Sequence, residues 1–94
     1  MFKIVFKPRA LKALAKAERK VQLAINSAAE KLQEGRFSLL DAKRIQRKKR
    51  GHRVRVGRWR ILLNLFDKEK RIEIVDIFMK KGKADYQKRM KLLR

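Results

Sequence analysis

The sequence has no cysteine, one proline, one histidine and only nine acidic residues among 94. Without cysteine, the chain can form neither a disulfide framework nor a thiolate metal site, and its few His, Asp and Glu residues argue against a zinc site. No apolar run approaches the roughly 20 residues that span a bilayer, and the N-terminus lacks the apolar core of a signal peptide. We therefore expect a cytosolic protein with no metal, no other cofactor and no membrane partner.

Positive charge and apolar side chains are what the sequence has in abundance. Lys and Arg number 29, which gives a formal net charge of +20, while hydrophobic residues make up 45% of the chain. This composition predicts one folded domain over residues 1–94 rather than a disordered chain. Because so basic a surface attracts polyanions, we expect nucleic acid or an acidic protein as the partner. An anionic membrane surface is the weaker alternative, since no strongly basic helix carries a wide apolar stripe.

The first third of the chain predicts a strand followed by two helices. Phe2–Lys7 is short and rich in β-formers, and Pro8 suits the first turn of a helix, where its missing N–H costs nothing. Apolar residues then recur at helical spacing on both sides of a bend at residues 18–20, and Gly35 is suited to end the second helix. The side chains expected to face the core are Leu11 and Leu14 in the first helix and Val21, Ile25 and Leu32 in the second.

The centre of the chain is its most basic part, with ten Lys or Arg among the eighteen residues from Lys43 to Arg60. Residues 37–40 are expected to form a loop, and residues 44–51 an exposed loop or the lead-in to a strand. Further along, a polar turn at 67–70 precedes the alternating strand Arg71–Phe78. After Gly82, residues 84–93 predict a terminal helix, with Tyr86, Met90 and Leu93 roughly aligned.

Residues 53–60 predict a β-hairpin that turns at Gly57-Arg58, because glycine in the first central position suits a type II′ turn. Val56 then pairs with Trp59, Arg55 with Arg60, Val54 with Ile61 and Arg53 with Leu62. Strand alternation places Arg53, Arg55 and Arg60 on one face and Val54, Val56, Trp59, Ile61 and Leu63 on the other, core-facing one. Since like charges placed opposite each other destabilise a hairpin, the arginine face indicates an anion, and RNA phosphate is the one we expect.

Taken together, these elements predict an α+β fold with the chain order β-α-α-β-β-β. It consists of a small antiparallel sheet, an N-terminal helical hairpin on one face and a possible C-terminal helix. We expect the first strand to insert beside the last.

Two motifs resemble the RelE/ParE superfamily of toxins from type II toxin–antitoxin modules. Residues 52–62 are similar to the family's aromatic-Arg-x-Arg-x-Gly-x-aromatic-Arg-Ile-x pattern, and residues 80–86 to its basic stretch and closing tyrosine. The resemblance covers nearly the whole chain in length and element order. Two positions depart from the pattern: Leu62-Leu63 occupies the place of a common aromatic, and lysines replace the arginine after the last strand.

The RelE-like branch of the family implies a ribosome-dependent endoribonuclease that cuts mRNA in the A site and inhibits translation. The implied partners are the ribosome with its 16S rRNA, the mRNA, and an acidic antitoxin that wraps the toxin, often displaces its terminal helix and binds operator DNA for the complex. Carried over residue by residue, the catalytic groups are Arg53, Arg55, Arg60, Lys80, Lys81 and Tyr86.

The residue types support this chemistry independently. Metal-free RNA cleavage needs a deprotonated 2′-hydroxyl, a stabilised phosphorane and a protonated 5′-oxygen, and fixed arginines supply the stabilisation. The candidates for the general base are His52, Lys80, Lys81 and Tyr86, and the clustered positive charge is expected to lower the pKa of a lysine or tyrosine. The residues expected to bind RNA phosphate without reading sequence are Arg47, Lys48, Lys49, Arg50 and Lys83.

Two other functions stay open. One is a ParE-like inhibitor of DNA gyrase, which has the same fold and no nuclease chemistry. The other is a non-catalytic RNA- or ribosome-binding protein, for which the net charge alone suffices. The arginine cluster with Tyr86 favours the nuclease, whereas the lysines after the last strand leave the gyrase inhibitor open.

Overall fold

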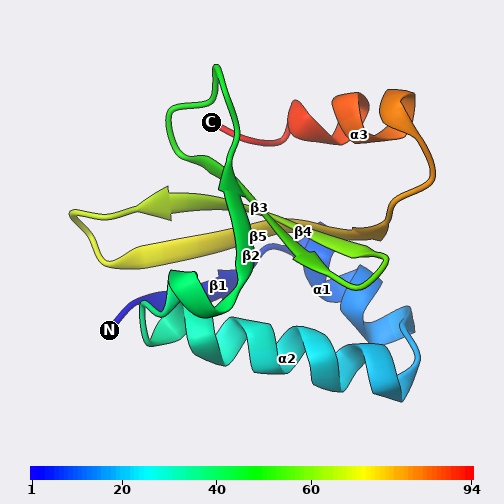
Figure 1. Ribbon diagram of the computed structural model, residues 1–94, viewed down its shortest axis with the longest axis horizontal. Coiled ribbons are helices and arrows are strands. Elements are labelled where there is room, and N and C mark those ends of the chain that lie inside the picture. The colour runs from blue at the N-terminus through cyan, green and yellow to red at the C-terminus, as the bar shows by residue number, and fades with distance from the viewer.

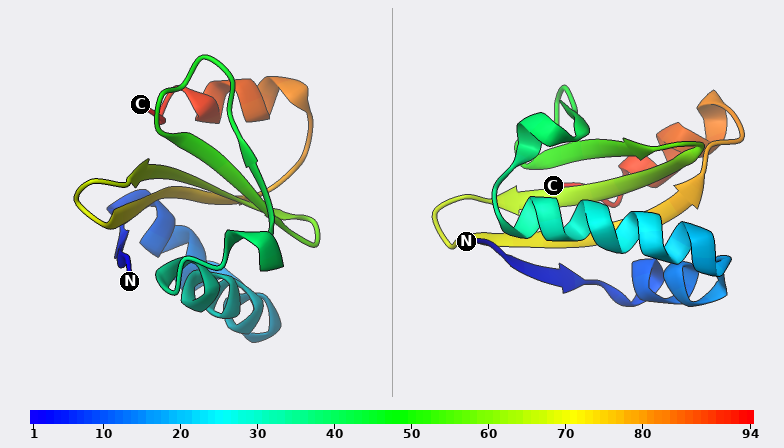
Figure 2. Two further views of the ribbon diagram at one scale, coloured as in Figure 1. Left: turned by 60° about the vertical axis from the view of Figure 1, so that its left-hand side comes forward. Right: turned by 60° about the horizontal axis from the view of Figure 1, so that its bottom comes forward.

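A five-stranded sheet in the order β1-β5-β4-β3-β2 separates two layers of helix (Figure 1). The computed structural model describes residues 1–94. Helices α1 and α2 lie against one face of the sheet and α3 runs over the other, as both views of Figure 2 show. The predicted α+β class is therefore confirmed. In chain order the elements are β1 (Lys3–Phe6), α1 (Pro8–Lys16), α2 (Arg19–Gln33), η1 (Phe37–Leu39), β2 (Asp41–Arg44), β3 (Gly51–Val56), β4 (Trp59–Phe66), β5 (Arg71–Met79) and α3 (Lys83–Met90).

The first strand inserts beside the last, as predicted. β1 runs parallel to β5, with Lys3 opposite Arg71, and every other neighbouring pair is antiparallel. The sheet has one strand more than predicted, because β2 adds to β3 at the outer edge. This strand is four residues long and mostly exposed, so it lacks the apolar alternation that marks a strand in a sequence. The predicted loop at 37–40 is largely the short helix η1.

The β3–β4 hairpin forms in the predicted register. Gly57 has φ +59° at the first central position of the turn, and Arg55 lies opposite Arg60. Val54 and Ile61 are fully buried on the side of α2, and Trp59 packs partly buried against them. The two faces of the hairpin therefore differ as the alternation predicts.

Helices α1 and α2 cover the apolar face of the sheet. The α1 side chains that face the core are not all the ones expected. Ile25 and Leu32 of α2 are fully buried, whereas Leu11 of α1 is 54% exposed. The prediction for Leu11 was wrong because α1 turns the small side chain of Ala10 onto the sheet, where it is fully buried. Gly35 follows the end of α2 with φ +74°, the left-handed conformation that glycine adopts most easily.

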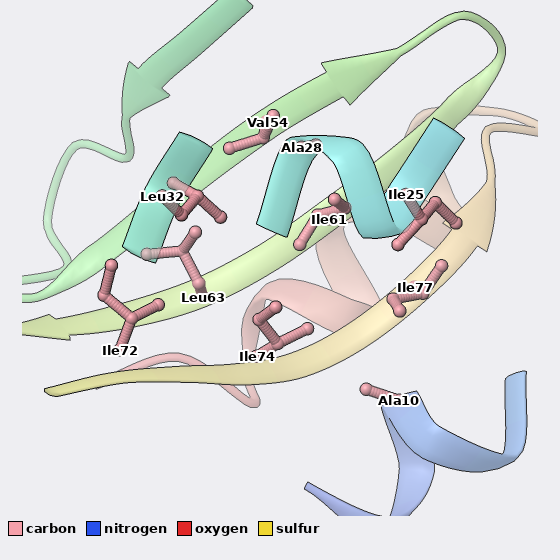
Figure 3. Close-up of a cluster of buried hydrophobic side chains, with 10 residues drawn as sticks. All are labelled: Ala10, Ile25, Ala28, Leu32, Val54, Ile61, Leu63, Ile72, Ile74 and Ile77. Atoms are coloured by element: carbon pink, nitrogen blue, oxygen red, sulfur yellow. The ribbon is translucent and has the colours of Figure 1, made fainter. Parts of the chain in front are cut away.

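The main core lies between these helices and the sheet. Figure 3 shows ten buried side chains that reach into it from α1, α2, β3, β4 and β5. A second, smaller cluster lies on the opposite face, where Leu62, Val75, Phe78 and Leu93 pack together. Residues 60–64 of β4 are all buried, so this central strand is covered on both faces.

A bulge in β5 divides the strand into two halves, and the alternation of core-facing residues is shifted by one position between them. Leu62 lies opposite Asp76 and Leu63 opposite Ile74, which leaves Val75 as an extra residue. The simple alternation predicted for this strand would place Asp76 on the core face with Ile74. Because a bulge shifts the alternation by one residue, Asp76 lies instead on the face that α3 covers.

Two leucines of α2 provide a test of this packing. Leu32→Ala is expected to lower the free energy of unfolding by about 2–5 kcal/mol, because the side chain is fully buried. Leu23→Ala removes the same atoms from a residue that is 58% exposed, so the change is expected to stay within about 0.5 kcal/mol. Unfolding in urea, followed by circular dichroism, measures both values, and equal effects would contradict the packing described.

Candidate functional site

Arg60 is a buried cation without a counter-anion. It is 7% exposed, and its Nη1 donates hydrogen bonds to the carbonyl oxygens of Gly57 and Trp59, each at 3.0 Å. No carboxylate pairs with it, and its buried Nε has no partner. Desolvation, together with the charges of Arg55 and Arg53, lowers its pKa below the ordinary value for arginine. A guanidinium kept in this way is suited to an incoming anion.

The neighbouring arginines are held from β2 by a carboxylate. Asp41 lies opposite Arg55, whose Nε donates to Asp41 Oδ2 at 2.7 Å, and Arg53 Nη2 lies 3.8 Å from Oδ1 of the same group. The role of Asp41 was not predicted from the sequence. Its signal was available, because Asp41 is the only acidic residue between Glu34 and Asp67.

Tyr86 on α3 completes the site above the sheet. Its ring meets that of Phe78 edge-on, with 6.0 Å between the centroids. Burial raises the pKa of Tyr86 above the ordinary 10.0, and the charges of Arg53 and Arg60 only partly oppose this. The expectation that clustered positive charge lowers a tyrosine pKa was therefore wrong for this residue, because desolvation outweighs the charges. At neutral pH Tyr86 is a neutral phenol, which donates a hydrogen bond or a proton.

Adjoining hollows extend the site along the surface between α3 and β2–β3. One of about 280 Å³ is lined by Arg53 and Tyr86 together with Lys80 and Lys83. The next, of about 370 Å³, shares Arg53 and Tyr86 and continues to residues 43–46. A third, of about 610 Å³, lies along residues 44–49 of the β2–β3 loop. Because neighbouring hollows share lining residues, they form one basic track with Arg53 and Tyr86 near its middle.

The structure separates the candidates for the general base. Lys80 lines the hollow of Arg53 and Tyr86, whereas Lys81 lines a different hollow beside Trp59. His52 lies opposite Leu63 on the other face of the sheet, and its Nδ1 is 3.1 Å from the Arg50 carbonyl oxygen. That position excludes His52 from chemistry at the arginine cluster. The period of two in β3 contained this information, because adjacent strand residues face opposite sides.

The predicted phosphate-binding residues occupy the β2–β3 loop and the start of α3. Arg47 and Lys49 are exposed, Arg47 with φ +68°. Lys48 Nζ donates to the Leu93 carbonyl oxygen at 3.3 Å, and the Arg50 guanidinium lies 4.9 Å from the centroid of the Phe66 ring. Lys48 and Arg50 therefore also hold the loop against the rest of the protein. No three His, Asp or Glu side chains gather closely enough to hold a metal ion.

No protein-family model matches the sequence, and a comparison with curated proteins finds no significant relative. Solved structures do match over nearly the whole chain. A chain of the archaeal RelE–RelB complex from Pyrococcus horikoshii superposes with a TM-score of 0.74 at 15% identity, covering 87% of this chain and 98% of that one. The RelB–RelE antitoxin–toxin complex from Methanococcus jannaschii gives 0.73 at 24% identity, over 87% and 96%. The isolated Escherichia coli RelE toxin gives 0.74 at 14% identity, over 97% of each chain.

These matches show that the chain has the fold of RelE toxins. The resemblance read from residues 52–62 and 80–86 is confirmed at that level. None of the structure's helices combines the length and apolar character needed to cross a membrane.

The chain has a single tyrosine, so its ionisation can be followed without interference from another. A spectrophotometric pH titration at the tyrosinate absorbance band is expected to give a pKa for Tyr86 above 10.0, because burial disfavours the charged phenolate. The unfolded chain in denaturant serves as the reference and is expected to titrate near 10. A folded-state value below that reference would mean that the arginines outweigh the burial.

Asp41→Asn is expected to strengthen binding of single-stranded RNA by up to about fivefold, because it releases Arg55 and removes a negative charge from the site. Asp67→Asn changes the net charge equally in a turn at the far end of β4 and is expected to have a smaller effect. Fluorescence anisotropy with a labelled oligonucleotide, at one fixed salt concentration, measures both affinities. Equal gains would show that only total charge matters.

Proposed function

We propose that this protein is a RelE-like toxin, a cytoplasmic endoribonuclease that inhibits translation by cutting mRNA in the ribosomal A site. The observation that carries the proposal is the buried guanidinium of Arg60, which has no counter-anion and has Arg53 and Tyr86 as close neighbours. A folded chain has little reason to bury an unpaired cation for stability alone, since the desolvation is not recovered. An anion that arrives with the substrate supplies the missing interaction.

The proposed reaction uses these groups directly and needs no metal ion. The 2′-oxygen attacks the phosphorus, the bond from phosphorus to the 5′-oxygen breaks, and Arg60 and Arg53 stabilise the charge of the phosphorane. Tyr86 is a neutral phenol and gives its proton to the departing 5′-oxygen. Lys80 is the proposed base that takes the proton of the 2′-hydroxyl, because it alone of the three other base candidates lines the hollow of Arg53 and Tyr86.

The basic track supports single-stranded RNA as the substrate. Lys80 and Lys83 lie at one end, Arg53 and Tyr86 in the middle, and residues 44–49 at the other end. Backbone phosphates follow such a row of cations, and the half-buried side chains of Ile45 and Met90 offer apolar surface to the bases. In this proposal the exposed cations of the β2–β3 loop contact the ribosome, including its 16S rRNA.

An acidic antitoxin is the proposed protein partner. Two of the matched structures are complexes of RelE with RelB, and one of them is described as an antitoxin–toxin complex. The net charge of +20 makes an acidic partner electrostatically complementary to almost any part of this surface. The proposed complex binds operator DNA through the antitoxin.

Induced expression in a bacterium tests the proposal. Wild-type protein is expected to arrest growth and to produce cuts inside translated codons, which primer extension detects. Arg60→Ala is expected to reduce cleavage by about 100-fold or more, because it removes a preorganised charge at the reacting phosphate. Arg58→Ala is the matched control, since it removes an exposed arginine from the turn of the same hairpin.

Each alternative function predicts its own result. Growth arrest without cuts in mRNA would favour the gyrase inhibitor, and RNA binding without arrest or cleavage would favour the binding protein. Equal losses in Arg60→Ala and Arg58→Ala would contradict the role given to Arg60. Because Arg60 also donates to carbonyl oxygens of the turn, circular dichroism must show that its variant is folded.

A further inference from the structure

Asp76 is a buried carboxylate that the proposed chemistry does not use. It is 1% exposed, and Oδ1 accepts a hydrogen bond from the Ile77 N–H at 2.9 Å. Oδ2 accepts one from Arg89 Nη1 of α3 at 2.8 Å, and Arg9 Nε of α1 lies 3.4 Å from the same oxygen. The bulge at Val75 is what places this carboxylate on the face under α3. Asp76 therefore joins the sheet to α3.

Arg89 connects that carboxylate to the aromatic pair of the site. Its guanidinium lies 4.5 Å from the centroid of the Phe78 ring, and Nε donates to both oxygens of Asp85 at 3.0 Å. Partial desolvation lowers the pKa of Arg89, but hydrogen bonds to Asp76 and Asp85 outweigh it and raise the pKa above the ordinary value for arginine. The guanidinium of Arg89 therefore keeps its charge in this contact.

Tyr86 lies beside the contacts of Arg89 with Asp76 and Phe78. It lies three residues before Arg89, so both side chains project from the same side of α3, and its ring packs on Phe78 beneath that arginine. Helix α3 itself has no buried residue, and its attachments lie in its last turn, at Arg89, and in the residues that follow it. Beyond the helix, Leu93 is buried in the second cluster and the Arg94 N–H donates to Asn64 Oδ1 at 2.9 Å.

We infer that Asp76 and Arg89 are positioning residues, which hold Tyr86 against Arg53 and Arg60 by clamping α3 to β5. The catalytic consequence rests on the proposed function, whereas the position of Tyr86 does not. Without the clamp, the attachment at Leu93 and Asn64 keeps α3 on the protein, but its Tyr86 end is free to move outward. A displacement of about 1 Å in a reacting group is enough to cost about 100-fold in rate.

The test uses the full chain with four variants: Asp76→Asn, Arg89→Gln, the double variant, and Asp85→Asn as control. Asn at position 76 keeps an oxygen for the Ile77 N–H, and Arg89→Gln leaves the core untouched, so its fold is retained even where Asp76→Asn destabilises the protein. Asp85→Asn removes the other carboxylate that binds Arg89 but leaves its bond to the sheet. The titration of the single tyrosine reports the surroundings of Tyr86 in each variant.

In Asp76→Asn and Arg89→Gln, the pKa of Tyr86 is expected to fall toward that of the denatured chain, because the ring becomes exposed beside Arg53 and Arg60. RNA cleavage is expected to fall by about 10- to 100-fold in both. The double variant is expected to match the worse single variant, since both changes break one contact. Asp85→Asn is expected to keep the wild-type titration.

An unchanged Tyr86 titration in folded Arg89→Gln would overturn the inference, and so would an equal shift in Asp85→Asn. Additive effects in the double variant would show two separate roles in place of one clamp. If the wild-type protein cleaves no RNA but its Tyr86 pKa moves as described, the proposed function fails and the clamp stands. The two failures are therefore distinguishable.

Discussion

The register of the β3–β4 hairpin is the constraint on which both faces of the sheet depend. The turn at Gly57-Arg58 places Arg55 opposite Arg60, and the same alternation sends Val54 and Ile61 into the main core. A slip of one residue would exchange the two faces, bringing guanidinium groups under α2 and exposing Trp59. The core therefore selects the register, and the register gathers the arginines. Site and stability are linked through one backbone arrangement.

Electrostatic pairing divides the arginines of this face into two kinds. Asp41 binds Arg55 directly and lies near Arg53, so these two have a partner when no substrate is bound. Arg60 is more deeply buried, and its only hydrogen-bond partners are carbonyl oxygens. Since a buried unpaired charge is costly, Arg60 is the position at which an anion gains most, and the neutral Tyr86 packs on Phe78, the residue opposite Arg60. This asymmetry sets Arg60 apart from the arginines of a merely solvated basic surface.

Helix α3 brings Tyr86, which is near the end of the sequence, to arginines from the middle of the sequence. It contributes little to the core, and the sheet holds it near its C-terminal end, through the bond from Arg89 to Asp76 and through Leu93 and Arg94 just beyond the helix. A helix attached mainly by polar contacts and its tail can shift without unfolding the sheet. RelE toxins share the fold of this chain at low sequence identity.

The sequence by itself determined what local periodicity encodes: the hairpin and its register, the end of α2 at Gly35, and the arginine face. Tertiary structure decided the rest. Strand β2 and its Asp41 have no apolar pattern of their own, and Ala10 rather than Leu11 faces the core because of how α1 sits on β5. The bulge at Val75 reversed the face of Asp76, and the burial of Tyr86 reversed the direction of its pKa shift. Burial, pairing and desolvation depend on segments far apart in the chain, which no local pattern specifies.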